Sequence, residues 1–176
     1  MYALRISAAL ILAVSQLSGQ EPRPAVISSA AIRLELSSAD GHVVSLRDWN
    51  GRRLAGAALD SIGLWALDLA PGSSPLTIDA AQAQHFEWRT TGARSLELSW
   101  SDFAKTPAPH LRVVATVQVR ADSTTAWRIR VEGIRGVAVD KVRFPRLTHI
   151  AVAGDNQELA VPSWMGQRAR DPSRLL

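Results

Sequence analysis

Residues 34–55, LELSSADGHVVSLRDWNGRRLA, contain two short turn signals between runs of alternating side chains. Apolar and polar residues alternate before Asp40-Gly41 and again after it, where Val44 and Leu46 lie on the apolar side. Such alternation is typical of strands that bury one face. Asp-Gly between two such runs favours a two-residue type I′ hairpin turn, in which both central residues have positive φ. The stretch therefore predicts a β-hairpin.

A second turn signal, Asn50-Gly51, follows closely, so the domain is expected to open as a meander of three strands. Further apolar or alternating runs follow, separated by turn residues at spacings of roughly 8–12 residues. These runs cover residues 62–69, 76–78, 85–90, 95–100, 111–120, 126–132 and 137–144. Residues 62–69 also fit a buried helical turn. The pattern predicts an all-β fold, an antiparallel β-sandwich over residues 31–150.

The last run changes its parity in the middle. Val137 and Val139 lie on one side of the expected strand, whereas Val142 and Phe144 lie on the other. One inserted residue near Asp140 accounts for this shift, which predicts a β-bulge at that position.

Residues 1–20 have the pattern of a helical secretory signal segment. Arg5 supplies the positive charge, residues 6–14 form a short apolar run, and small and polar residues follow. The run is shorter than the roughly 20 residues that a membrane-spanning helix needs. A buried core helix is the alternative. We expect a secreted or periplasmic protein without a stable membrane span after signal removal, and a linker over residues 21–30.

Composition excludes several kinds of chemistry. The chain has no cysteine, which excludes disulfides, thiolate metal sites and cysteine nucleophiles. The formal net charge is +4, but the arginines are scattered and form no basic run, so no nucleic-acid partner is predicted. The four histidines lack the spacing of a zinc site. No catalytic residue, metal site or cofactor is predicted.

Six tryptophans form the most unusual part of the composition. Trp88, Trp100 and Trp127 fall at inward positions of alternating runs, which predicts core packing. Trp49 lies in a turn and Trp164 in a Pro-Ser-Trp segment, so core packing does not account for either. Because an aromatic face suits the apolar face of a sugar ring, we predict that these two contact carbohydrate or a neighbouring domain.

The residues quoted above resemble a known family. Residues 34–55 are similar to the first meander of the galactose-mutarotase-like β-supersandwich. VRFPRL at residues 142–147, followed by LAVPSWMGQ at residues 159–167, resembles the N-terminal supersandwich domain of large secreted bacterial glycoside hydrolases. The resemblance covers residues 32–171. It implies that a (β/α)8 barrel carrying the catalytic carboxylates follows the sandwich.

Such a barrel needs about 250 residues, and this chain has 176. The resemblance therefore implies a fragment: a non-catalytic sandwich whose residues 151–176 form an irregular exit segment toward a missing C-terminal catalytic barrel. A free-standing secreted sandwich that binds carbohydrate is the alternative. An enzyme in its own right, such as a sugar epimerase, is a third reading to which no residue of the chain is assigned.

Overall fold

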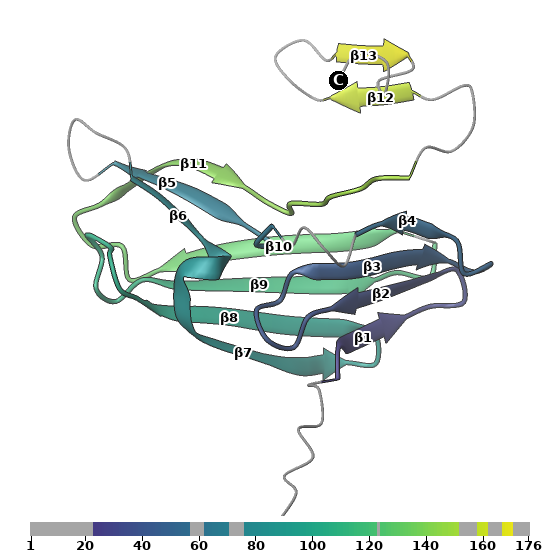
Figure 1. Cartoon of the computed structure of the whole chain (residues 1–176), viewed down its shortest axis with the longest axis horizontal. Helices are drawn as coiled ribbons and strands as arrows, with labels where there is room; N and C mark the ends of the chain where they lie inside the picture. The colour runs from purple at the N-terminus through teal and green to yellow at the C-terminus, as the bar shows by residue number, and fades with distance from the viewer. Residues whose placement is uncertain are drawn as a thin grey trace, which may run out of the picture.

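The computed structural model describes residues 23–56, 62–70, 76–122, 124–151, 158–161 and 167–170. In this part of the chain the fold is all-β, with antiparallel sheets packed as a β-sandwich, as predicted (Figure 1). One short 3-10 turn, η1 (Ala80–Gln82), interrupts the strands. The strands are β1 (Ala25–Ser28), β2 (Ile32–Leu36), β3 (Val43–Asp48), β4 (Arg53–Ala55), β5 (Ala66–Ala70), β6 (Leu76–Asp79), β7 (Ala83–Gly92), β8 (Ser95–Phe103), β9 (Arg112–Val119), β10 (Thr125–Glu132), β11 (Ala138–Arg143), β12 (Glu158–Val161) and β13 (Gln167–Arg170).

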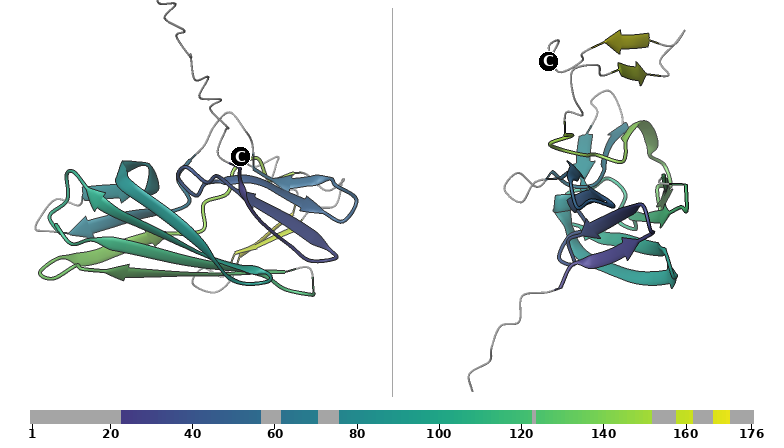
Figure 2. Two further views of the ribbon diagram at one scale, coloured as in Figure 1. Left: turned by 90° about the horizontal axis from the view of Figure 1, so that it is seen from below. Right: turned by 90° about the vertical axis from the view of Figure 1, so that its right-hand side faces the viewer.

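The longest sheet forms one whole layer of the sandwich, in the strand order β10-β9-β8-β7. The other layer is divided between a sheet of order β1-β2-β3-β4 and a sheet of order β11-β5-β6 (Figures 1 and 2). Buried side chains of all three sheets belong to one hydrophobic cluster. Strands β12 and β13 pair with each other.

An aromatic group lies at the centre of the core. Trp65 packs edge-on against Trp100, with ring centroids 5.8 Å apart, and against Phe103 at the same separation. Leu96 and Leu98 of β8 are buried beside them. Each fully buried side chain of this size contributes about 1.5–3 kcal/mol through the hydrophobic effect, so this group stabilises the contact between the layers.

The stretch 62–69 is a strand only in its second half. β5 begins at Ala66 and pairs with both β6 and β11. Residues 62–65 precede it without forming a helix, so the helical alternative is wrong. Leu67 and Leu69 share the face of β5 that is buried in the core, whereas Asp68 between them lies on the other face and accepts hydrogen bonds from Arg143.

Two segments expected to be irregular contain strands. Ala25–Ser28, within the expected linker, forms β1 and pairs with β2, and Ala25 and Ile27 are buried. Four residues are too few to show a convincing period, and β1 is held by its pairing with β2. Residues 158–161 and 167–170, within the expected exit segment, form the β12–β13 pair. Residues 1–20, to which the signal segment was assigned, lie outside the described residues.

The connection between β2 and β3 is longer than the predicted two-residue turn. Gly41 has a φ of 76°, but Asp40 does not have positive φ, so the turn is not type I′. The backbone N–H of Ser37 donates to the carbonyl of His42 at 2.9 Å, and that of Gly41 donates to Ser37 at 3.0 Å. The loop therefore closes around residues 37–42.

The register of β3 also differs from the prediction. The pairing of β2 with β3 shifts between Glu35 and Leu36, so that Leu36 lies opposite Val43. Val43 is buried in the core in place of Val44, which was expected to point inward. Leu46 still packs against the core, as predicted. A register shift of this kind turns one side chain to the other face of the sheet, and the alternation of apolar and polar residues in the sequence does not show it.

The predicted bulge in the last long strand is confirmed. β11 pairs with β5, and the register shifts between Val139 and Lys141, which places the extra residue at Asp140. After Phe144, whose peptide bond to Pro145 is cis, the chain runs beside the small sheets.

The segment after β11 is tied to the sandwich by its backbone. The N–H of Arg146 donates to the carbonyl of Leu64 at 2.8 Å. The N–H of Gly56 donates to Thr148 and that of Ala151 to Leu54, both at 2.8 Å. Residues 148–151 therefore run beside β4, as the trace above β4 in Figure 1 shows.

Candidate functional site

The turn between β3 and β4 is fixed by one carboxylate. Asp48 Oδ1 accepts hydrogen bonds from the backbone N–H of Asn50 at 2.9 Å and of Arg52 at 2.8 Å. The backbone of Asp48 accepts from Gly51 and donates to Arg52, both at 2.9 Å. Gly51 has a φ of 78°, which a residue without a Cβ adopts at no steric cost. Both sides of the turn are therefore held in one conformation.

This fixed turn presents Trp49 to solvent. The side chain is 75% exposed, the most exposed large hydrophobic side chain in the described part of the chain. Arg47 Nη1 donates to the carbonyl of Gly51 at 3.0 Å, and Arg52 Nε lies 3.4 Å from Asp48 Oδ2. Two guanidinium groups thus lie at the base of the turn that carries the indole.

The chemistry of this turn suits binding. The indole offers a flat apolar face, and Arg47 and Arg52, each with one N–H group engaged within the turn, keep further N–H donors at its base. A pyranose presents the complementary groups, with C–H bonds on its face and hydroxyls at its rim. The carboxylate of Asp48 is already hydrogen bonded to the backbone of the turn, so it is committed to holding the turn together.

Trp164, the second residue predicted to contact carbohydrate or a domain, lies outside the described residues. It falls in the sequence between β12 and β13. The candidate site is therefore built on Trp49 alone.

Two of the three tryptophans predicted to lie in the core are packed there. Trp100 is fully buried, and its Nε1 donates to the carbonyl of Asp40 at 2.9 Å. Trp127 is half-buried and packs edge-on against Phe144, with ring centroids 6.0 Å apart. Its Nε1 donates to Thr125 Oγ1 at 2.9 Å.

The prediction for Trp88 is wrong. Its side chain is 38% exposed and is not part of the core cluster. The parity of the strand is as expected, because Trp88 lies opposite the buried Leu98. However, β7 is the edge strand of its sheet, and its inner face is only partly covered.

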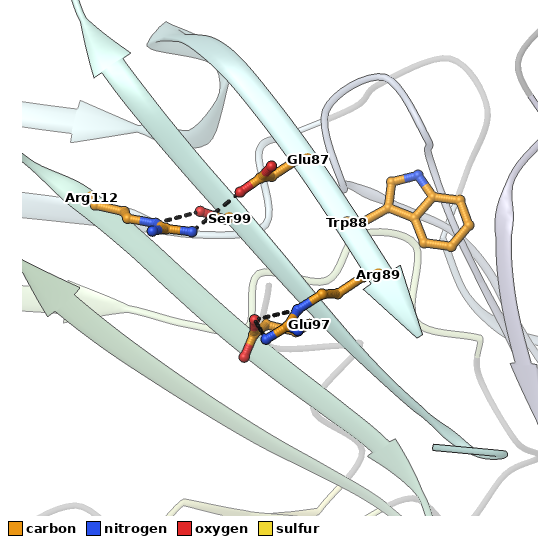
Figure 3. A pocket seen from close by; sticks show the side chains of 6 residues that line it. All are labelled: Glu87, Trp88, Arg89, Glu97, Ser99 and Arg112. Carbon is orange, nitrogen blue, oxygen red and sulfur yellow. Dashed lines mark hydrogen bonds and ion pairs between the residues drawn. The ribbon is translucent and has the colours of Figure 1, made fainter. Parts of the chain in front are cut away.

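A shallow hollow of about 230 Å³ lies on the outer face of the long sheet, and the sequence analysis did not identify it. It is lined by Glu87, Trp88, Arg89, Glu97, Ser99 and Arg112 (Figure 3). The only signal in the sequence is the polar side of the runs that form β7, β8 and β9. Which of these side chains meet depends on strand order, which alternation does not specify.

Two ion pairs cross the strands at this hollow. Arg89 Nη2 lies 2.6 Å from Glu97 Oε1. Arg112 Nη2 lies 3.2 Å from Glu87 Oε1, and its Nε donates to Ser99 Oγ at 2.8 Å. The four charges cancel, and each guanidinium is engaged by a carboxylate of the same chain. The hollow is therefore a weaker candidate for ligand binding than the turn at Trp49.

Other kinds of site are not seen in the described ranges. No group of three or more metal-ligating side chains occurs there. His42 Nδ1 lies 2.7 Å from Asp40 Oδ1, an isolated pair at the base of the 37–42 loop. Within the same ranges, no helix has the length and hydropathy needed to cross a membrane.

Comparison of the chain with protein-family models gives no match, and comparison with curated proteins gives none either. The resemblance to the galactose-mutarotase-like supersandwich therefore stays a prediction. The antiparallel β-sandwich itself is established by the structure.

Proposed function

We propose that this chain is a non-catalytic β-sandwich of a glycoside-hydrolase-like, carbohydrate-active protein, and that it contacts carbohydrate through Trp49. The observation that supports this proposal is the 75% exposure of an indole on a turn whose backbone is fixed by Asp48. Single large apolar side chains on a surface are common, but a tryptophan on a turn with a fixed backbone, with Arg47 and Arg52 on either side of it in the sequence, has the form of a binding group.

The rigidity of the turn favours binding energetically. Ordering a side chain at an interface costs about 0.5–1.5 kcal/mol, and a tryptophan has only two side-chain torsions to fix. Because the backbone under Trp49 is already held, only these two torsions remain to be ordered when a ligand binds. One ring gives weak affinity for a single sugar, so binding to a polymer with many equivalent sites is the appropriate measurement.

The test is retention of the purified chain on a panel of neutral and acidic polysaccharides, by sedimentation with insoluble polymers and by affinity electrophoresis in gels containing soluble ones. We expect wild-type retention on at least one polymer, and loss of that retention in Trp49→Ala. The matched control is Leu76→Ala, which removes another exposed apolar side chain, 37% exposed, from β6.

The free energy of unfolding of both variants should lie within about 0.5 kcal/mol of the wild-type value, as is usual for surface substitutions. Equal retention of Trp49→Ala and the wild type contradicts the role of Trp49. No retention of the wild type on any polymer contradicts carbohydrate binding by this chain.

A second candidate function is the support of a neighbouring catalytic domain. Val142 of β11 is 45% exposed, and Ile150, in the segment that follows β11, is 70% exposed. The resemblance implies that a barrel follows this segment, and these side chains are of the kind that a domain contact would cover. A barrel-coding reading frame downstream in the gene would favour this candidate. Weaker association of that barrel with an Ile150→Asp variant, but not with Trp49→Ala, would support it further.

A further inference from the structure

The strand β7 is an open edge. It has ten residues, and within the described part of the chain it pairs with β8 on one side only and ends its sheet. From Glu87 to Gly92 every residue is exposed. An edge strand presents a row of backbone N–H and C=O groups that can pair with another strand.

We propose that two copies of this chain associate through β7, antiparallel, about a twofold axis that passes between Trp88 of one copy and Trp88 of the other. The two long sheets then become one continuous sheet of eight strands, four from each copy. This inference stands on the edge strand alone and is independent of carbohydrate binding at Trp49.

The charges on β7 favour an axis at Trp88 over an axis at either neighbouring residue. The outward side chains of the exposed edge are His85, Glu87 and Arg89. A twofold axis at Glu87 would oppose two carboxylates, and an axis at Arg89 would oppose two guanidinium groups; like charges directly opposite each other are destabilising. An axis at Trp88 places Glu87 of each copy opposite Arg89 of the other. This register thus forms two opposite-charge pairs.

The ion pairs already present in each copy fit this arrangement. Glu87 is held by Arg112 at 3.2 Å, and Arg89 is held by Glu97 at 2.6 Å. Pairing Glu87 of one copy with Arg89 of the other joins these into an alternating row of four charges across the junction. A second copy therefore finds its partner charges already oriented.

The other face of β7 supplies an apolar contact. Figure 3 shows Trp88 pointing away from the charged side chains that line the hollow. Its indole is 38% exposed, and no described strand pairs with the outer side of β7. In the proposed register the two indoles lie directly opposite each other, and aromatic cross-strand pairs stabilise a sheet.

The first test uses the absence of cysteine from the chain. In Trp88→Cys the two introduced thiols lie opposite each other, at a Cα separation of about 4.5–5.5 Å. This separation lies within the range of about 4.4–6.8 Å that a disulfide spans. In the matched control Thr90→Cys, each thiol faces residue 86 of the other copy and is about four residues from its counterpart.

After mild oxidation, we expect a covalent dimer of Trp88→Cys on a non-reducing gel, and at least a tenfold smaller fraction of dimer for Thr90→Cys. Equal cross-linking of the two variants, or none of either, contradicts the register. Cross-linking of Thr90→Cys alone would indicate a different alignment and also overturns the proposal.

The second test exchanges charges. Glu87→Arg and Arg89→Glu each place like charges at both junction pairs, so each variant alone should sediment as a monomer at concentrations where the wild type is a dimer. An equimolar mixture restores opposite charges at both pairs and should sediment as a dimer. Arg130→Glu on β10, the other edge of the same sheet, is the control and should behave as the wild type. A monomeric wild type, or a mixture that stays monomeric, overturns the proposal.

Discussion

Two turns of this protein have similar sequences and opposite surroundings. Gly41 and Gly51 have φ values of 76° and 78°. A Cβ added at Gly41 would lie 2.7 Å from the ring of Trp100 and 2.9 Å from that of Phe86, whereas one added at Gly51 would meet nothing within 4 Å. Both turns thus need a residue with positive φ, but one turn packs on the core and the other presents Trp49 to solvent.

The hydrogen bonds of the two turns differ in the same way. In the 37–42 loop, the carbonyl of Asp40 accepts from Trp100 Nε1, 60 residues later in the chain, so the loop is attached to the opposite layer. In the β3–β4 turn, Asp48 bonds only within the turn. A self-contained turn can therefore change its side chains without disturbing the core, which suits a binding position.

The largest expected difference in stability is between the alanine variants of Gly41 and Gly51. Gly41→Ala should lower the free energy of unfolding by about 3 kcal/mol, because left-handed backbone strain of about 1–2 kcal/mol adds to overpacking of about 1–3 kcal/mol. Gly51→Ala should cost only the backbone strain, about 1 kcal/mol. Urea unfolding of both variants measures the difference. Equal losses would contradict the packing of the 37–42 loop on Trp100.

A smaller effect on stability, but a larger one on binding, is expected at Asp48. Asp48→Ala removes the acceptor of two backbone hydrogen bonds and should cost about 1 kcal/mol. Without these bonds the backbone under Trp49 is no longer fixed before the ligand binds, so binding must also order the turn. Polysaccharide retention should therefore fall several-fold.

The matched control for Asp48 is Asp122→Ala. Asp122 Oδ1 accepts from the backbone N–H of Thr124 at 3.2 Å and from its hydroxyl at 2.6 Å, so it stabilises a different turn in a similar way. The control should lose comparable stability and keep full retention. If both variants lose retention equally, retention reports general stability and not the turn at Trp49.

Much of the fold was predictable because alternation depends on which face a side chain occupies. It gave the inner faces of β8 and β9 and located the bulge at Asp140 through the parity change between Val139 and Val142. It failed where a tertiary feature intervened. The shift that brings Val43 into the core leaves no trace in the pattern, since valine also occupies the next position.

The candidate site was predictable only in part, for a related reason. Trp49 could be assigned to a turn because Asn50-Gly51 follows it, and a turn residue is exposed. The exposure of Trp88 depends on β7 being an edge, and strand order is a property of the whole fold. The pair between Arg112 and Glu87 joins residues 25 positions apart on strands that are not neighbours, so no local pattern could indicate it.

The smallest expected effect concerns the acid stability of the core-packed turn. Burial raises the pKa of Asp40, but hydrogen bonds with Ser37 and His42 outweigh it, so its pKa lies below the ordinary value of 3.8. Because the folded-state pKa is below the unfolded one, ionised Asp40 stabilises the fold above pH 3.8, and this contribution is lost as the pH falls through the folded-state pKa.

The urea concentration at the unfolding midpoint should fall as the pH is lowered below 3.8, and in Asp40→Asn it should fall less steeply than in the wild type. The decline is flattened only in part because Glu35 and Asp68 also have lowered pKa values, each through a hydrogen bond with an arginine. Gly51→Ala is the control: it lowers stability at every pH and should leave the shape of the profile unchanged. A profile of Asp40→Asn parallel to the wild type would mean that the ionised carboxylate adds nothing to the loop, and that the backbone bonds and the bond from Trp100 hold it.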